Sequence, residues 1–230
     1  MQKNQKGKII QALSVDSVIF GFEEAKLKVL LIKRAIKPEY GTWALPGGFI
    51  KYSEDISEAA YRVLKEHTGV QDLYMEQLGA FGDIDRFPDE RVITIVYYAL
   101  IKPGKYEINP GPDATDAAWF SLKELPRVPF DHKKIIDAAL ARLRRQFKYK
   151  PIGFNLLADK FPLLDLQELY EALYGVEFDK PNFRRKIMKM NLLVPLEEKQ
   201  QGVPHRSARL FKFDKERYDN LTEKGFIFEF

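Results

Sequence analysis

The sequence has no cysteine, only three histidines and no long apolar run. Without cysteine there is no disulfide framework and no thiolate metal site, so nothing indicates an oxidising compartment. A membrane-spanning helix needs about 18 consecutive apolar residues, and no such run is present. The basic opening MQKNQKGK also lacks the apolar core of a signal peptide. We therefore expect a cytoplasmic protein with no membrane partner.

The chain has 230 residues, of which 45% are hydrophobic, which is enough for one large domain or two smaller ones. Its net charge of +4 is too small to indicate a polyanionic partner by itself. The charge is concentrated, however. Between Lys180 and Lys212, nine positive side chains stand against two negative ones, a local excess of +7. The position of the charge is therefore more informative than its total.

The first 130 residues predict a mixture of strands and turns. The β-rich runs at 14–22 and 26–35 predict a hairpin, and a third strand is expected at 91–101. Residues 102–115 are rich in turn formers and predict a loop. Residues 117–130, with a strand and two prolines, close this part of the chain.

A short strand and a helix are expected between these runs. Residues 43–49 predict a strand that leads into the Gly47-Gly48 turn. Asp55 is a suitable N-cap with Glu58 three residues later, and Gly69 is a suitable end of the helix. Apolar residues recur at helical spacing and predict one buried face: Ile56, Ala59, Ala60, Val63 and Leu64.

From residue 131 the pattern becomes helical. Residues 131–150 predict a helix whose apolar stripe comprises Ile135, Ile136, Ala139, Leu140 and Leu143. Beyond it, helical segments are predicted at 155–161, 164–175 and 179–191, and a hairpin with a basic tip at 192–213. The expected capping residues are Asp165 with Glu168, Gly175, Asp179 and Asn191.

Residues 47–69 resemble the Nudix hydrolase box, in which three glutamates of one helix hold magnesium against a substrate diphosphate. The surrounding GTWALPGGFI and the later AAWFSLKELP extend the resemblance over about residues 10–130. The positions that match the box are Gly48, Glu54, Arg62, Leu64, Glu66, Gly69 and Val70, and the mismatches are Val63 and His67.

The two mismatches leave Glu66 as the single carboxylate of the three. Valine supplies no ligand, and imidazole suits zinc or copper better than magnesium. Two interpretations stay open. Glu66 forms an ion pair with Arg62, which Glu54 joins in a structural brace, or a loop acid such as Glu90 completes a metal site. We predict no metal, no cofactor and no catalytic residue, and residual hydrolase activity stays open.

An effector pocket is expected around the glycine turn, which lets backbone approach a bound molecule closely. In Nudix folds the loop before the 91–101 strand borders the ligand site, and here its carboxylates and guanidinium suit sugar hydroxyls. The alternative is a solvated loop with mutually paired charges. His67 is expected to interact with the helix dipole or free carbonyls. The predicted pocket comprises Arg34, Trp43, Gly47, Gly48, Glu66, Phe81, Asp83, Asp85 and Arg86.

Three helices and a basic hairpin are the components of a winged helix-turn-helix. Its third helix can enter the major groove, where Arg reads guanine and Asn reads adenine, while the hairpin meets phosphates. For a basic helix alone, a solvated face is the plainer interpretation. The DNA-binding residues expected are Lys180, Asn182, Arg184, Arg185, Lys186, Lys189, His205, Arg206 and Arg209.

Together with the stretches DHKKII, LDLQELYEALYG and NFRRKI, the whole chain resembles the Nudix-related transcriptional regulators of bacteria. The resemblance implies an α+β fold. A Nudix-like α/β/α sandwich with a mixed sheet is expected over residues 1–150, including a basic linker helix from about 131, and a winged helix-turn-helix over 151–230. It also implies a repressor that binds double-stranded operator DNA as a homodimer and senses a small effector.

Members of that family respond to ADP-ribose-like ligands or to pentoses. A diphosphate would lack its usual metal counter-ion here, whereas an uncharged sugar needs none. We therefore expect a pentose such as arabinose, and control of carbohydrate metabolism, with an ADP-ribose-like nucleotide second. The alternatives are an active Nudix hydrolase of a nucleoside diphosphate sugar with an appended nucleic-acid module, and an RNA-binding or scaffold role.

Overall fold

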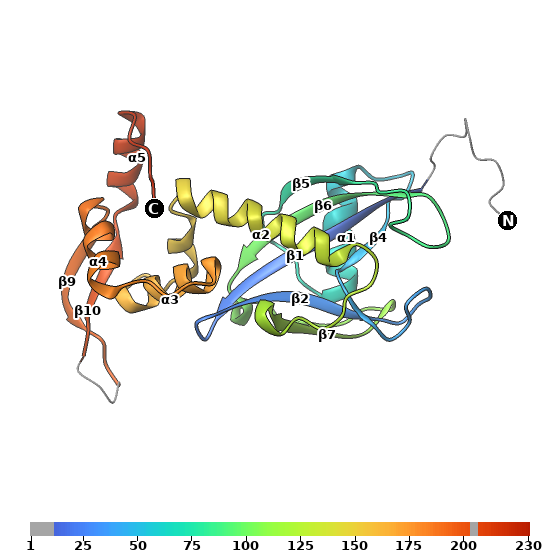
Figure 1. The fold of residues 1–230 in the computed structure, drawn as a ribbon, viewed down its shortest axis with the longest axis horizontal. Helices are drawn as coiled ribbons and strands as arrows, with labels where there is room; N and C mark the ends of the chain where they lie inside the picture. Colours follow the sequence, from blue (N-terminus) through green and yellow to red (C-terminus); the bar gives the residue numbers. More distant parts are fainter. Residues whose placement is uncertain (1–11, 203–206) are drawn as a thin grey trace. The chain divides into compact units, whose positions relative to one another are not determined.

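The computed structural model describes residues 12–202 and 207–230, which form two compact units (Figure 1). The first unit contains the residues up to 21 and 28–139, and the second contains 22–27 and 140–230. The units divide inside a helix, and the domain boundary near residue 150 stays a prediction. Among the described helices, none is long and apolar enough to cross a membrane.

The first unit is built on a seven-stranded mixed sheet with the main order β3-β2-β1-β6-β5. In addition, β4 pairs with β1 and β7 pairs with β2. β1 and β6 are parallel, and β1 is buried on both faces from residue 14 to residue 21. The strands are β1 (Ala12–Glu23), β2 (Lys26–Arg34), β3 (Trp43–Ala44), β4 (Gly47–Phe49), β5 (Glu76–Phe81), β6 (Val92–Ile101) and β7 (Ala114–Ser121).

The three predicted long strands are confirmed as β1, β2 and β6. β1 and β2 are neighbours joined by a two-residue turn, in which Glu24 and Ala25 have φ of 51° and 56°. Positive φ at both central residues is what a tight hairpin turn requires. β5 was not expected, because its sequence EQLGAF has no β-branched residue and only a weak alternation of polar and apolar positions. Two short 3₁₀ helices complete the connections: η1 (Pro103–Lys105) and η2 (Leu122–Glu124).

Helix α1 (Ile56–Thr68) begins and ends as predicted. The Asp55 side chain accepts the Glu58 backbone N–H at 2.8 Å, the Glu58 carboxylate accepts the Asp55 N–H at 2.9 Å, and Gly69 takes a left-handed φ of 74°. The buried face of α1 packs with Val15 and Ile19 of β1 in the main core. Figure 1 shows α1 and the first turns of α2 (His132–Tyr149) on opposite faces of the sheet, which is the expected sandwich.

The second unit contains the end of α2 and a winged helix with a three-stranded sheet in the order β8-β10-β9. Gly175 and Asp179 cap the helices as predicted, and Asn191 has the expected positive φ of 55°. The elements are η3 (Ile152–Leu156), β8 (Phe161–Pro162), α3 (Leu163–Tyr174), α4 (Lys180–Lys189), β9 (Leu193–Lys199), β10 (Arg209–Phe213) and α5 (Lys215–Glu223).

Three details of this unit differ from expectation. The helix predicted at 155–161 is absent: η3 ends at Leu156, and Phe161 pairs with Phe211 as a strand and is 1% exposed, so tertiary pairing overrides local preference. The predicted capping pair of α3 is also wrong, because the helix begins directly after Pro162 and Asp165 lies in its first turn. Finally, α5 was not anticipated.

Candidate functional site

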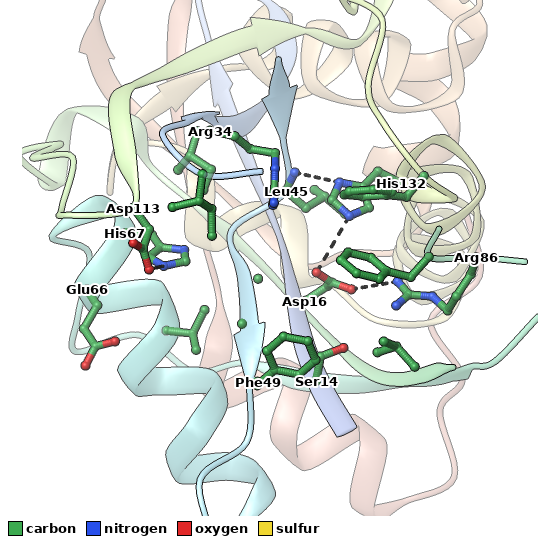
Figure 2. A pocket seen from close by; sticks show the side chains of 18 of the residues that line it. Ser14, Asp16, Arg34, Leu45, Phe49, Glu66, His67, Arg86, Asp113 and His132 are labelled. Carbon is green, nitrogen blue, oxygen red and sulfur yellow. Dashed lines mark hydrogen bonds and ion pairs between the residues drawn. The ribbon is translucent and has the colours of Figure 1, made fainter. Parts of the chain in front are cut away.

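A cavity of about 240 Å³ lies in the first unit, between β1, β2, β4, α1 and the start of α2 (Figure 2). Side chains alternate along a strand, so Ser14 and Asp16 of β1 both line the cavity, as do Ile32 and Arg34 of β2. Phe130 contributes an aromatic ring. The cavity therefore combines apolar walls with a few convergent charged groups, as ligand sites generally do.

Gly47 and Gly48 leave room for neighbouring side chains. Gly47 lies opposite Asp16 where β4 pairs with β1. A Cβ on Gly47 would come within 2.0 Å of Asp16 Oδ1, and a Cβ on Gly48 would lie 3.1 Å from a methyl group of Val63. The predicted Gly47-Gly48 turn is wrong, because both glycines lie in β4 and pair with β1. The close approach expected for a ligand at these glycines is made by the protein's own Asp16 carboxylate.

Asp16 belongs to a buried charged cluster. Arg86 donates to Asp16 Oδ2 at 3.1 Å and makes two hydrogen bonds to Asp131, at 2.9 and 3.0 Å. Asp16 is 6% and Arg86 is 7% exposed. Buried charges are tolerated when they are paired and hydrogen-bonded. Two carboxylates share one guanidinium, so this end of the cavity has an excess of negative charge.

His132, the first residue of α2, completes the cluster. Its Nδ1 accepts the Leu45 backbone N–H at 3.0 Å, so the proton of the neutral ring is on Nε2. Nε2 lies 3.8 Å from Asp16 Oδ1, beyond hydrogen-bond distance. Burial lowers the pKa of His132, although Asp16 and Asp131 oppose that shift. The ring is therefore neutral at pH 7.

Two cations line the β2 side of the cavity. Arg34 Nε donates to the Pro38 carbonyl at 3.0 Å, and its guanidinium lies 5.4 Å from the centre of the Phe130 ring. Burial lowers the pKa of Arg34, while Asp16 and Asp113 raise it, and a guanidinium stays charged at neutral pH. Its terminal nitrogens, and Lys37 Nζ, form no hydrogen bond within residues 12–202 and 207–230. Both are available to an anionic ligand.

The surface of α1 carries the predicted brace. Arg62 donates to Glu54 through two nitrogens, each at 2.6 Å, and to Glu66 at 2.8 Å. The hydrogen bonds from Arg62 lower the pKa of Glu54 to about 2. The interpretation of Glu66 as part of an ion-paired brace is confirmed.

These residues do not fit a magnesium site. Val63 is 1% exposed and supplies no ligand, Glu66 is held by Arg62, and Glu90 borders a separate hollow beside Phe49. Within the part of the chain that the structure describes, no three His, Cys, Asp or Glu side chains are grouped as a metal would need.

His67 lines the cavity and, contrary to expectation, forms no hydrogen bond with helix carbonyls. It is 7% exposed, and its Nε2 lies 3.9 Å from Asp113 Oδ2. Its buried Nδ1 has no hydrogen-bond partner among the described residues. Burial lowers the pKa of His67, although Asp113 and Glu66 act in the opposite direction. Like His132, this histidine is neutral at pH 7.

The structure places only some of the predicted effector-pocket residues in the cavity. Trp43 is outside the cavity, because it pairs with Lys33, points to the other face of the sheet and packs against Phe120 with ring centroids 4.7 Å apart. Phe81 ends the edge strand β5. Asp83 binds Lys134, as in the expected alternative of mutually paired loop charges, and Asp85 borders a shallow hollow. Five of the nine residues line the cavity: Arg34, Gly47, Gly48, Glu66 and Arg86.

Seven polar residues that line the cavity were absent from the predicted pocket: Ser14, Asp16, Lys37, Arg62, His67, Asp113 and His132. One signal was available for Asp16, because it is the only charged residue in the apolar run SVDSVIFGF. A charge in a strand with two buried faces needs a partner or a function. No local signal pointed to His132, whose contact with Leu45 joins residues 87 positions apart.

In the second unit, α4 exposes a row of polar and basic side chains while Phe183 and Ile187 are buried. Asn182 Oδ1 accepts a hydrogen bond from Arg185, and Lys186 Nζ lies 4.9 Å from the centre of the Phe230 ring. Arg184 has no such contact within the described parts of the chain. The exposed predicted DNA-binding residues of α4 are Lys180, Asn182, Arg184, Arg185, Lys186 and Lys189.

In the hairpin of β9 and β10, the predicted DNA-binding residue Arg209 forms hydrogen bonds within the hairpin itself. Arg209 donates to the Leu196 carbonyl at 2.8 Å and to Glu197 at 2.6 Å. Lys199 and Lys212 are exposed on the same hairpin. The predicted His205 and Arg206 lie outside the residues that the structure describes.

Two domain families match the chain. Residues 11–139 match the NUDIX domain, and residues 153–213 match the NrtR DNA-binding winged helix domain. Fold and site therefore define a transcriptional regulator in which a Nudix domain is joined to a DNA-binding winged helix. The chain is 32% identical over 213 residues to the "ADPR responsive transcriptional repressor NtrR" of Acinetobacter baylyi, covering 90% of this chain and 84% of the relative. The chain belongs to the NrtR-type Nudix-related transcriptional repressors.

Solved structures of related proteins support this family assignment. Shewanella oneidensis NrtR complexed with a 27mer DNA aligns with a TM-score of 0.68 and 30% identity, over 87% of this chain and 93% of that one. The NUDIX domain of the same protein complexed with ADP ribose aligns with a TM-score of 0.55 and 32% identity, over 62% and 94%. An ADP-ribose pyrophosphatase of Methanocaldococcus jannaschii is 42% identical over 125 residues, which is 54% of this chain and 70% of that enzyme.

Proposed function

We propose that this repressor binds operator DNA through its winged helix and senses ADP-ribose in the cavity of its first unit. The observation that carries the proposal is the pair of cations that line the cavity, Arg34 and Lys37, whose terminal nitrogens form no hydrogen bond within the described residues. The same chain carries the basic helix α4. A diphosphate forms its strongest hydrogen bonds with such groups. The name of the A. baylyi relative and the ADP-ribose complex of the S. oneidensis Nudix domain support this ligand.

The expected preference for a pentose finds no support in these relatives. That expectation holds only if a metal is the sole counter-charge available to a diphosphate. In that case the loss of metal ligands on α1 would mean the loss of diphosphate binding. Arg34 and Lys37 can neutralise a diphosphate directly, without a metal. We therefore place ADP-ribose first and do not propose control of carbohydrate metabolism.

For DNA, α4 is proposed to lie in the major groove, with Arg184 and Asn182 facing base edges and Lys180 and Lys189 near phosphates. A homodimer would place two such helices on the half-sites of a two-fold symmetric operator. Sedimentation analysis of the protein with and without a selected operator tests this arrangement. A complex of one chain with one duplex would contradict the dimer.

Operator affinity measured with and without ADP-ribose tests the whole proposal. Duplexes selected from a random pool by the full-length protein supply the cognate site, and a scrambled duplex is the control. We expect a preference for the cognate duplex and a change of its affinity when ADP-ribose is added, because a ligand that binds two states unequally shifts their balance. Equal binding of both duplexes, or an affinity that ADP-ribose leaves unchanged, would contradict it.

An active Nudix hydrolase of ADP-ribose with a nucleic-acid module is the second candidate, and the identity with the M. jannaschii ADP-ribose pyrophosphatase favours it. The poor fit of the α1 residues to magnesium argues against it. Product release from ADP-ribose with magnesium decides between the two. The paired substitution Val63→Glu with His67→Glu is the comparison, and turnover by the unmodified protein at an enzyme-like rate would establish the hydrolase.

A further inference from the structure

Asp16 lines the cavity, and its Oδ1 accepts no hydrogen bond from the described residues. Arg86 binds the other oxygen, Oδ2, at 3.1 Å, whereas His132 Nε2 lies 3.8 Å from Oδ1. The Asp16 side chain is 8% exposed and lines the cavity (Figure 2). A carboxylate oxygen in a largely buried site gains from a hydrogen-bond donor. A ligand in the cavity can supply that donor.

We propose that Asp16 accepts a hydrogen bond from a hydroxyl group of the effector, and that it selects a ligand whose end is an uncharged sugar over one that ends in phosphate. The inference rests on the proposed function, the sensing of ADP-ribose. A sugar hydroxyl is a donor that can reach Oδ1. A terminal phosphate would bring negative charge to a cluster in which Asp16 and Asp131 already share one guanidinium, and such repulsion is a source of specificity.

The charged groups of the cavity suit different parts of the ligand. Arg34, whose terminal nitrogens form no hydrogen bond within the described residues, and Lys37 receive the diphosphate, whereas Asp16 receives the terminal ribose. ADP-ribose carries a diphosphate followed by a neutral sugar, so it offers a partner both to the cations and to Asp16. ADP has the same adenosine and the same two phosphates, but it ends at the β-phosphate. It therefore has no sugar hydroxyl to donate to Asp16, and its terminal phosphate carries one more negative charge than in ADP-ribose.

Gly47 supports this assignment, because it fixes the place of the carboxylate. Its missing side chain leaves the space that Asp16 Oδ1 occupies, and a Cβ there would lie 2.0 Å from that oxygen. Substitution of Gly47 therefore moves the acceptor without removing its charge. This offers a test of position that is independent of a test of charge.

Titration calorimetry of the full-length protein with ADP-ribose and with ADP tests the proposal. The wild-type protein should bind ADP-ribose at least about tenfold more tightly than ADP, as expected for one hydrogen bond to a charged group. Asp16→Asn should weaken ADP-ribose about tenfold or more and leave ADP unchanged or tighter, because the substitution removes both the charged acceptor and the repulsion. Gly47→Ala should weaken ADP-ribose selectively.

Matched controls separate recognition from folding. Asp89→Asn removes one exposed carboxylate elsewhere, and Gly104→Ala adds a methyl group where nothing lies within 4 Å. Both should bind the two ligands as the wild type does. Melting temperatures show which variants are folded, and the comparison of the two ligands on the wild-type protein needs no variant.

The outcomes also separate this inference from the proposed function. If ADP binds the wild-type protein as tightly as ADP-ribose, or if folded Asp16→Asn weakens both ligands equally or neither, Asp16 does not read the terminal sugar. ADP-ribose sensing would still hold in those cases, provided that ADP-ribose changes operator affinity. If the wild-type protein binds no ADP-ribose, both proposals are wrong.

Discussion

At the scale of single residues, the missing side chain of Gly47 leaves the space that the Asp16 carboxylate occupies. The glycine has no unusual φ, so its conformation does not explain it. The explanation is the 2.0 Å separation that a Cβ would have from Asp16 Oδ1. A glycine that matches the Nudix pattern thus makes room for the Asp16 carboxylate that lines the cavity.

The two buried histidines of the cavity predict a pH dependence of stability. Burial lowers the pKa of both His67 and His132 below 6.5 in the folded protein. Below pH 6.5 the unfolded chain therefore binds protons that the folded chain does not, and stability falls as the pH is lowered. Each histidine can contribute a slope of up to about 1.4 kcal/mol per pH unit.

Urea unfolding between pH 7.5 and 5 measures this slope. His132→Asn keeps an acceptor near the Leu45 N–H but removes the titrating ring, so its stability should depend less steeply on pH. His67→Asn should have a similar effect, and the double variant should be flatter still. Slopes identical to that of the wild type would show that these rings do not titrate on unfolding.

At the scale of elements, α4 and the hairpin are proposed to make different kinds of contact with DNA. Arg184 is exposed and makes no hydrogen bond, ion pair or ring contact within the described residues, whereas Lys212 is exposed on β10, opposite Val194 of β9. A base-reading residue affects some sequences, and a phosphate contact affects all of them. This distinction makes the two elements separable by experiment.

Arg184→Ala should reduce the preference for the cognate duplex by about 1–3 kcal/mol. Lys212→Ala should weaken cognate and scrambled duplexes alike and lower the slope of log affinity against log salt by about one. Fluorescence anisotropy at several salt concentrations measures both quantities. A uniform loss from Arg184→Ala would place that arginine on the backbone instead of on a base.

The segment after α5 packs against α4, the helix proposed to read DNA. The Phe230 ring lies 4.0 Å from the Tyr170 ring and 5.4 Å from that of Phe183, and Lys186 of α4 lies over the same ring. The Phe230 N–H also donates to the Lys148 carbonyl of α2 at 3.0 Å. The aromatic core of the winged helix therefore includes residues that follow the winged-helix match.

Phe230→Ala should destabilise the second unit by roughly 2 kcal/mol, less than a fully buried phenylalanine would cost, and it should weaken DNA binding because Lys186 loses its support. Thermal unfolding and cognate-DNA affinity are the measurements. Ile227→Ala, at a side chain that is 73% exposed, is the matched control and should change neither. Equal effects of the two substitutions would contradict a specific role for Phe230.

At the scale of the whole molecule, one helix belongs to both units: α2 supplies His132 to the cavity and Phe147 to the buried residues of the second unit. Effector and operator are proposed to bind different units of one chain. Thermodynamic linkage then requires each ligand to change the affinity of the other by the same factor.

Reciprocal titrations test that linkage. The factor by which saturating ADP-ribose changes operator affinity should equal the factor by which saturating operator changes ADP-ribose affinity, typically about 5–150-fold. Arg184→Ala should leave ADP-ribose affinity in the absence of DNA unchanged, because it lies outside the cavity. Unequal factors would indicate additional species, such as a change in the number of chains on the DNA.

The sequence by itself determined the local elements and the class of protein. The ends of α1, the hairpin of β1 and β2, the brace around Arg62 and the basic row of α4 all depend on residues close in the chain. Capping, side-chain alternation and helical spacing act over a few residues, so such features can be predicted. The two domain patterns then indicated a Nudix-related regulator.

Only the tertiary structure decided which charges meet in the cavity. Asp16 and Arg86 are 70 residues apart, and Leu45 and His132 are 87 apart. Such pairs depend on sheet order and helix packing, which local patterns do not specify. Pairing between residues 50 positions apart, Phe161 and Phe211, also makes Phe161 part of a strand. Burial then decides the charge states of the histidines, because desolvation opposes their protonation.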